Sequence, residues 1–238
     1  MPWTYVGGVK DATASISYSP TVGNMLIVFS ATTAGGGSPL LSVTDNIGSK
    51  WLPALPTTAA DIWFAGAWYL PRCPAGITTI TLSYNGGAPS TLRNCLVEYS
   101  GGPPPSIPLN TKPAAFTFST AVDGIVAPSI YVTPPPAMVV AFCGDISGTG
   151  TTAVAGTGYT SRFTTTQTQV EDARFSSAGV RTPTFTDTTT GATDSFVVMT
   201  LAFSETPKYN PSRGSTLPSI ADPADQDYKS ELTILRWF

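Results

Sequence analysis

The chain has 238 residues, of which 42% are hydrophobic and 11% are charged, against a usual charged share of about 25%. Its net charge of −3 excludes a broad basic surface, and no apolar run approaches the roughly 20 residues of a membrane helix, so we expect neither nucleic acid nor a membrane as a partner. Histidine is absent, which excludes Ser-His-Asp and Cys-His catalysis, His-ligated zinc and an imidazole pH switch within this chain.

Short apolar runs rich in β-branched and aromatic residues, separated by turn residues, predict an all-β fold. Alternation is clearest at Ile62, Phe64, Gly66, Trp68 and Leu70, which we expect on one face of a strand. The strands are predicted, in chain order, at Ser15–Tyr18, Met25–Ala31, Leu40–Thr44, Ile62–Leu70, Thr78–Tyr84, Arg93–Ser100, Phe116–Phe118, Ser129–Thr133, Met138–Gly144, Tyr159–Thr164, Val170–Ser176, Thr182–Thr186 and Ser195–Ser204.

A weak internal repeat relates the two halves of these strands. The segment from Tyr18 to Phe29 has a counterpart 113 residues later, from Tyr131 to Phe142, with Met at the same place in both. Each half has too few strands for a comfortable sandwich of its own. We therefore predict one jelly-roll-like double-sheet β-sandwich over residues 1–205, built from two similar halves; two tandem immunoglobulin-like sandwiches are the alternative.

The composition changes after residue 205. Residues 206–238 are rich in charge and interrupted by proline, which predicts an extended C-terminal arm rather than a domain. The arm ends in an apolar segment that either packs on the chain's own sandwich or binds a neighbouring subunit. The residues expected to bind a partner are Tyr228, Leu232, Ile234, Leu235, Trp237 and Phe238.

The run Leu41–Trp51, LSVTDNIGSKW, contains the pattern V-T-D-N-x-G before an aromatic residue. With the segments Ala67–Tyr69, Ala75–Leu82 and Cys95–Gly101 that follow, it resembles a β-sandwich domain of bacteriophage structural and fibre-type proteins and of bacterial surface proteins. The resemblance covers roughly residues 15–205, includes no catalytic residue, and departs from the family at Ser49, where Asn is usual. Asp45, Asn46 and Gly48 suit a tight turn between strands.

The resemblance implies a non-enzymatic virion structural protein: a capsid decoration, head-fibre or tail-fibre subunit that forms oligomers and attaches through its C-terminal arm. Its expected partners are other virion proteins and copies of itself. The segment Met1–Thr4 shows neither the basic start nor the apolar stretch of a secretory signal, so we expect synthesis in the host cytoplasm followed by assembly into the virion. The alternative is a carbohydrate-binding or adhesive module, whose partner is a host-surface glycan.

Other candidate sites are weaker, and we predict no catalytic, cofactor or metal site. Gly148, Gly150 and Ala153 have the spacing of a dinucleotide fingerprint but no helix follows them. Most carboxylates fall in turns, and no spacing rule pairs the two that lie on strands, Glu98 and Glu171, as glycoside hydrolysis requires. The acidic residues at 222, 225 and 227 lack the order of a calcium loop.

Two further sets of side chains are predicted to belong to the interior. Cys73, Cys95 and Cys143 are widely spaced and odd in number, so we expect no complete disulfide framework, and Cys95 and Cys143 are predicted to be buried thiols. The aromatic residues Trp51, Trp63, Trp68 and Tyr69 form a sugar-stacking platform if they face outward, although core packing is the default for them.

Overall fold

The computed structural model describes residues 1–11, 13–33, 39–60, 63–86, 89, 91–103, 108–119, 124–146, 152–162, 167–188 and 194–205; for residues 11, 33, 56–60, 63, 108–119 and 194 it describes the backbone alone. The chain divides into two units, Met1–Pro207 and Lys208–Phe238, and every described residue lies in the first unit. The described part is built from β-strands and contains no helix, which confirms the predicted all-β class. It accordingly has no helix that is long and apolar enough to cross a membrane.

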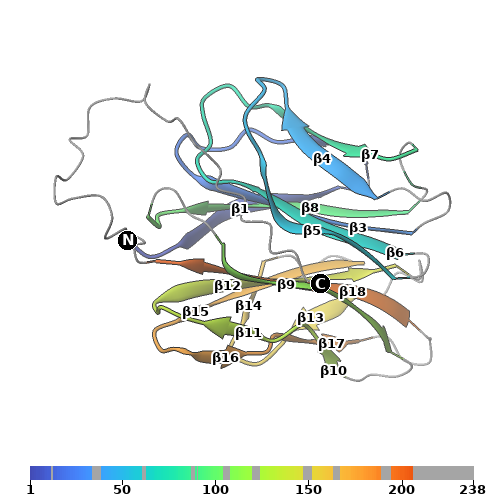
Figure 1. Cartoon of the computed structure of the whole chain (residues 1–238), viewed down its shortest axis with the longest axis vertical. Helices are drawn as coiled ribbons and strands as arrows, with labels where there is room; N and C mark the ends of the chain where they lie inside the picture. The colour runs from blue at the N-terminus through green and yellow to red at the C-terminus, as the bar shows by residue number, and fades with distance from the viewer. Residues whose placement is uncertain are drawn as a thin grey trace, which may run out of the picture. The chain divides into compact units, whose positions relative to one another are not determined.

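The first half of the unit contains eight strands in two antiparallel sheets. The strands are β1 (Thr4–Asp11), β2 (Ser15–Ser17), β3 (Met25–Thr33), β4 (Leu40–Asp45), β5 (Leu52–Ala60), β6 (Trp63–Leu70), β7 (Thr79–Tyr84) and β8 (Leu92–Ser100). Five of them form the first main sheet, in the order β1-β8-β3-β6-β5, and the other three form the first outer sheet, in the order β2-β7-β4 (Figure 1).

The second half contains ten strands in three antiparallel sheets. They are β9 (Pro108–Ser119), β10 (Gly124–Val126), β11 (Ile130–Val132), β12 (Ala137–Asp145), β13 (Ala153–Ala155), β14 (Thr160–Ser161), β15 (Thr168–Phe175), β16 (Gly179–Arg181), β17 (Thr184–Asp187) and β18 (Asp194–Ser204). The second main sheet has the order β14-β15-β12-β18-β9; β10-β17-β13 and the pair β11-β16 form the second outer sheets.

The two main sheets share one plan. Read across the sheets, the order β1-β8-β3-β6-β5 of the first corresponds to the order β9-β18-β12-β15-β14 of the second, and the outer order β2-β7-β4 corresponds to β10-β17-β13. The two repeated sequence segments fall on equivalent strands, because Met25 begins β3 and Met138 is the second residue of β12, and each strand is central in its sheet. The topology therefore confirms the internal repeat.

Both central strands are buried on both faces, which explains their unbroken apolar sequences. In β3 the side chains of Met25, Ile27 and Phe29 belong to the cluster that also contains residues of the second main sheet. The alternate residues Leu26 and Val28 belong to a second cluster, which they share with the first outer sheet. A half-buried strand would show polar residues at every other position, whereas β3 is covered from two sides.

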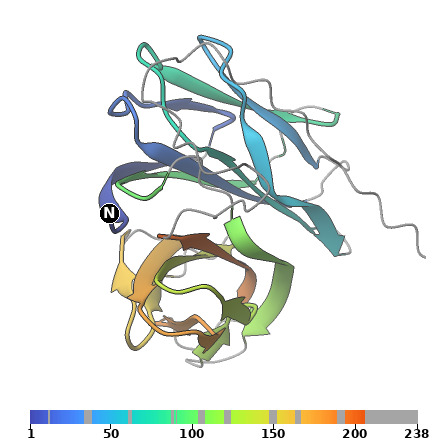
Figure 2. The ribbon, with the colours of Figure 1, turned by 60° about the vertical axis from the view of Figure 1, so that its left-hand side comes forward.

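The largest hydrophobic cluster lies between the two main sheets and takes residues from both halves. At its centre the rings of Phe29 and Phe142 stack with centroids 5.4 Å apart and an interplanar angle of 11°. These two residues occupy the same position in the 113-residue repeat. In Figures 1 and 2 the two main sheets lie face to face, with the outer sheets on their far sides. The two halves therefore share one interior.

Every strand predicted from the sequence overlaps a strand of the structure, but five strands were not predicted: β1, β5, β10, β13 and β16. Gly7 and Gly8 interrupt β1, where the pairing with β8 shifts register between Tyr5 and Gly7. Prolines interrupt β5, which lies at the edge of its sheet and so tolerates them. The remaining three strands have three residues each, too short for a periodic signal.

Candidate functional site

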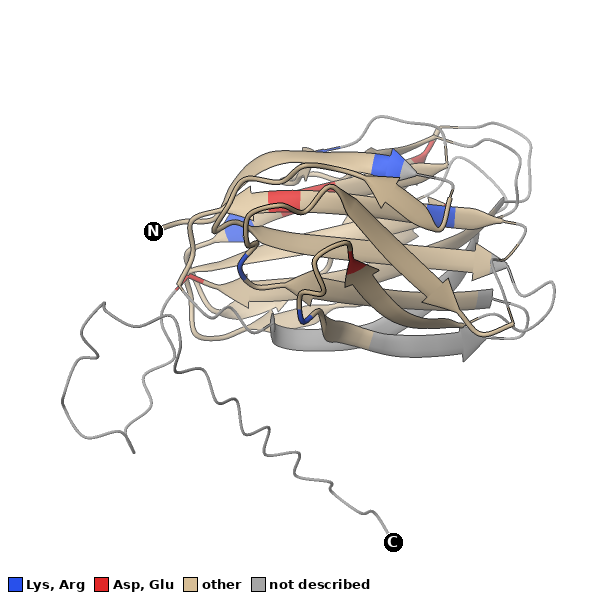
Figure 3. Cartoon of the chain, turned by 90° about the horizontal axis from the view of Figure 1, so that it is seen from above, with Lys and Arg blue, Asp and Glu red and all other residues tan. Residues whose placement is uncertain are grey.

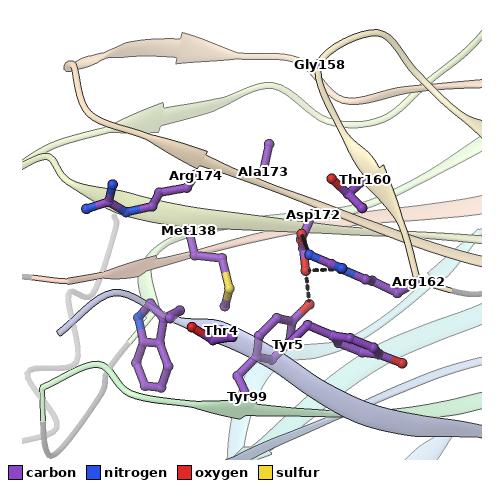
Figure 4. A pocket seen from close by; sticks show the side chains of 11 residues that line it. Thr4, Tyr5, Tyr99, Met138, Gly158, Thr160, Arg162, Asp172, Ala173 and Arg174 are labelled. Carbon is purple, nitrogen blue, oxygen red and sulfur yellow. Dashed lines mark hydrogen bonds and ion pairs between the residues drawn. The ribbon is translucent and has the colours of Figure 1, made fainter.

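A pocket of about 340 Å³ opens at one end of the interface between the main sheets (Figure 4). It lies where β1 and β8 of the first sheet meet β12, β14 and β15 of the second, so residues far apart in the sequence line it. The lining residues are Trp3, Thr4, Tyr5, Tyr99, Met138, Gly158, Thr160, Arg162, Asp172, Ala173 and Arg174.

An ion pair between Arg162 and Asp172 forms one wall of the pocket. The Arg162 Nε and Nη2 groups donate to the two carboxylate oxygens of Asp172 at 2.8 and 2.7 Å. The Tyr99 hydroxyl donates to the same carboxylate at 2.8 Å and joins the two main sheets. Asp172 is 6% exposed and Tyr99 is 1% exposed, so the buried Tyr99 hydroxyl holds the Asp172 carboxylate, and with it the ion pair to Arg162, in a fixed geometry.

Two tyrosine rings support this wall. The guanidinium of Arg162 lies 4.7 Å from the centroid of the Tyr5 ring, a cation–π contact. Tyr5 in turn meets Tyr99 edge to face, with ring centroids 5.8 Å apart. Burial, followed by the charge of Asp172 and its hydrogen bond, raises the pKa of Tyr99 well above the usual value, and the hydrogen-bonded Asp172 raises the pKa of Arg162. Tyr99 therefore stays neutral and Arg162 stays charged at physiological pH.

A second ion pair borders the opposite side. The Arg174 Nε group donates to Glu205 at 2.7 Å, and the other oxygen of that carboxylate accepts the backbone N–H of Trp3 at 3.3 Å. The indole N–H of Trp3 donates to the carbonyl oxygen of Ser204 at 3.1 Å. A Cβ at Gly102 would collide with the Trp3 ring, so this glycine is required for the indole to lie here. The start of β1 is thereby tied to the end of β18.

The pocket offers hydrogen-bond donors, whereas the carboxylates beside it already accept hydrogen bonds from the protein. Its two cations are matched by two carboxylates, and both oxygens of Asp172 already accept hydrogen bonds from Arg162. A general acid or base needs an oxygen that reaches the substrate's proton, and Asp172 has its oxygens turned to the protein. Oxygen acceptors of a ligand would meet guanidinium N–H groups and the Thr160 hydroxyl instead.

Glu98 and Glu171, the two carboxylates considered for glycoside hydrolysis, lie in different parts of the core. On β8 the residues Cys95, Val97 and Tyr99 face the second main sheet, so Glu98 faces the first outer sheet. It is 2% exposed and accepts hydrogen bonds from the Tyr18 hydroxyl at 2.7 Å and from the backbone N–H of Thr21 at 2.9 Å, and also from the Asn24 side chain. This carboxylate is fully engaged in holding the chain between β2 and β3.

Glu171 on β15 points the other way. Its neighbours Val170 and Asp172 face the first main sheet, so Glu171 faces the second outer sheets. It is fully buried; its Oε2 accepts the backbone N–H of Gly156 at 2.8 Å, while its Oε1 has no hydrogen-bond partner among the described residues. Burial raises the pKa of Glu171 to about 7. With both main sheets between Glu98 and Glu171, the two carboxylates cannot act on one glycosidic bond.

The run Leu41–Trp51, which contains the V-T-D-N-x-G pattern, continues from β4 into a turn that is held by its own side chains. The Asp45 carboxylate accepts the backbone N–H groups of Ile47 at 3.1 Å and Ser49 at 3.0 Å, and the indole N–H of Trp51 at 2.9 Å. Burial opposes the ionised form of Asp45, but the hydrogen bonds from Ser49, Trp51 and Ile47 outweigh it and lower the pKa of the carboxyl. Gly48 has a φ of 76°, as the predicted tight turn requires.

Most of the other predicted residues are either buried or undescribed, and Trp68 is half-buried against the cluster under the first outer sheet. Cys73, Cys95 and Cys143 are all buried free thiols. Trp51 and Tyr69 are 5% and 3% exposed and pack in the hydrophobic clusters, so they do not form an outward platform. The side chain of Trp63, most of the loop from Gly148 to Ala153, and all six partner-binding residues of the arm (Tyr228, Leu232, Ile234, Leu235, Trp237 and Phe238) lie outside the described residues.

Charge and metal ligands are sparse over the described part of the chain. Figure 3 shows Lys, Arg, Asp and Glu as isolated positions on a ribbon that is mostly uncharged. Within the described residues no group of three or more Cys, Asp or Glu side chains is arranged to hold a metal ion. No family model matches the chain, and neither does any curated protein or solved structure.

Sequence reasoning did not single out this pocket. Tyr5 lies on β1, a strand that was not predicted, and Trp3 lies just before it; Arg162 and Asp172 fall in two separate predicted strands, and no pattern in the sequence pairs them. Their meeting depends on the stacking of β1 against β14 and β15, across more than 150 positions of sequence. One available signal was the repeat, which predicts that two equivalent sheets face each other.

Proposed function

We propose that this chain is a non-enzymatic virion structural protein: a capsid decoration, head-fibre or tail-fibre subunit of a bacteriophage. The strand order of each half is the observation that carries the proposal. A jelly roll of eight strands places strands 1-8-3-6 in one sheet and 2-7-4-5 in the other, an architecture frequent in viral capsid proteins. The first half has 1-8-3-6-5 and 2-7-4, which differs from that scheme by the position of one edge strand.

The jelly-roll assignment is part of the same proposal. The second half repeats the order of the first, so we infer two jelly-roll-like halves whose main sheets are stacked, rather than one sandwich spread over both halves. Stacking places the largest hydrophobic cluster between the two main sheets, with further clusters between each main sheet and its outer strands. Such a body suits a rigid building block that repeats in a symmetric particle.

The described carboxylates also favour a structural role. Glu98, Glu171 and Asp172 are each buried within hydrogen bonds that join neighbouring elements, and Glu98 and Glu171 face different interiors. The alternative function, a carbohydrate-binding or adhesive module based on Trp51, Trp63, Trp68 and Tyr69, is disfavoured because Trp51 and Tyr69 are buried.

Attachment is proposed to occur through the apolar end of the C-terminal arm, residues 232–238, with other virion proteins or copies of the chain as partners. Deletion of Leu232–Phe238 is expected to abolish oligomer formation in light scattering and co-sedimentation with virions, with an unchanged circular dichroism spectrum. A matched control replaces Lys229 and Glu231 with serine and keeps the apolar residues. Assembly by the deletion variant at wild-type levels would refute attachment through this segment.

A further inference from the structure

The pocket at the end of the main-sheet interface has a chemistry that the structural role does not use. We propose that it binds one pyranose ring of a surface polysaccharide, with the guanidinium groups of Arg162 and Arg174 as donors to the sugar's hydroxyl oxygens. This site differs from the aromatic platform considered above and does not depend on virion attachment. Its volume of about 340 Å³ is near the lower limit for small-molecule sites, as one sugar ring requires.

The arginines of the pocket have more N–H hydrogen-bond donors than the neighbouring carboxylates accept from. A guanidinium carries five N–H groups, and Asp172 accepts from two of the five on Arg162. Glu205 accepts from the Nε group of Arg174, whose side chain is 53% exposed. The two ion pairs have no net charge, so the site offers hydrogen-bond donors without a net positive charge that would attract an anion. Hydroxyl oxygens of a neutral sugar match this balance better than a phosphate does.

The pocket also has apolar surface next to these donors. In Figure 4 Arg162 and Arg174 lie on opposite sides of Met138 and Asp172, and the rings of Tyr99 and Tyr5 lie below Asp172 and Arg162. A pyranose presents hydroxyl groups around its rim and a face of C–H groups, so it needs both kinds of surface. Aromatic rings and a thioether supply the apolar contact, and planar guanidinium groups supply the directed hydrogen bonds.

The donors are held in place before a ligand arrives. Arg162 is fixed by two hydrogen bonds to a buried carboxylate and by the Tyr5 ring under its guanidinium, and that carboxylate is fixed by Tyr99. A ligand therefore binds without ordering this side chain, which lowers the entropic cost of binding.

The test uses the full chain, labelled with ¹⁵N, and a panel of glucose, galactose, mannose, N-acetylglucosamine and glucuronate. The chain has five tryptophans, and Trp3→Phe identifies the indole signal of Trp3, which lines the pocket. We expect that signal to shift saturably with at least one sugar, with a dissociation constant on the order of millimolar. A Trp3 signal that no sugar of the panel shifts would overturn the proposal.

Two matched arginine variants provide the second part of the test. Arg174→Gln is expected to weaken binding about tenfold, the effect of one lost hydrogen bond from a charged group. Arg181→Gln is the control, because it makes the same substitution at an arginine that is not among the pocket's lining residues; the Arg181 guanidinium lies 4.4 Å from the centroid of the Phe175 ring instead. Equal affinity in Arg174→Gln and the wild type, or an equal loss in both variants, would refute the site.

A third variant keeps the test decisive if Arg174→Gln does not fold. Thr160→Val removes an exposed hydroxyl at the rim and conserves the side-chain shape, so it is expected to fold and to weaken binding severalfold. Unchanged binding in that variant would count against the proposal. A chain without Leu232–Phe238 is expected to keep the full sugar response, so loss of virion attachment and loss of sugar binding are distinguishable outcomes.

Discussion

The stacked rings of Phe29 and Phe142 allow a direct test of the shared interior. Both side chains are fully buried, and their centroids are 5.4 Å apart across the two main sheets. Replacing either ring with leucine loses aromatic contacts and leaves an imperfectly filled space, so each single variant is expected to lower the free energy of unfolding by about 1–2 kcal/mol.

The double variant Phe29→Leu/Phe142→Leu measures the contact itself. An aromatic pair contributes about 0.5–1.5 kcal/mol beyond its buried area, and this contribution is lost in either single variant. The double variant should therefore be less destabilised than the sum of the singles by about 1 kcal/mol, as measured by urea unfolding of all four proteins of the cycle.

Phe185 supplies the control for this cycle. It is also fully buried, but it lies in the cluster between the second main sheet and an outer sheet, away from Phe29. The pair Phe29→Leu/Phe185→Leu is expected to be additive within about 0.5 kcal/mol. If Phe29 and Phe142 were also additive within that margin, the rings would not be in contact and the face-to-face stacking of the main sheets would be wrong.

Two further predictions concern the carboxyl groups of Glu171 and Asp45. Because the pKa of Glu171 is raised to about 7, its contribution to stability is present below about pH 4.5 and is lost as the pH rises through 7; Glu171→Gln should remove up to about 3 kcal/mol of this decline in denaturant titrations between pH 4.5 and 8. Because the pKa of Asp45 is lowered, its contribution is present above the pKa of the unfolded chain and is lost at acid pH; Asp45→Ala should lower the free energy of unfolding at pH 7 by about 2–3 kcal/mol.

Each of these predictions has an outcome that contradicts it. A wild-type stability that rises between pH 4.5 and 7 by an amount that depends on Glu171 would mean that the carboxyl is ionised and paired in the folded chain. For Asp45, a variant as stable as the wild type would mean that the Trp51 indole and the Ser49 backbone find other acceptors, so the turn would not depend on this carboxylate.

The sequence predicted the strands wherever an apolar run is long and free of glycine and proline. The central strands β3, β12 and β18 are of this kind, because they are covered on both faces and need no polar residue at alternate positions. The edge strands β1 and β5 were missed because glycines interrupt the first and prolines interrupt the second. In β1 the pairing with β8 absorbs an irregularity at Gly7, and a Cβ there would lie only 3.0 Å from the Tyr18 hydroxyl.

Long-range pairing limited what the sequence predicts about the site. The repeat at Met25 and Met138 correctly indicates equivalent strands, but it contains no information on which faces of the two sheets meet. That choice decides whether Tyr99 meets Asp172 and whether Arg162 covers Tyr5. Local spacing identified Asp45 and Gly48 as turn residues because their partners are within six positions along the chain.

Native-state hydrogen exchange tests the central claim that the two halves share one interior and unfold as one body. We predict that amides at the centres of β3 and β12 exchange with the same free energy of opening, equal to the free energy of global unfolding in urea. Exchange of β12 at a clearly lower free energy, while β3 stays protected, would show that the halves are independent and would contradict the account.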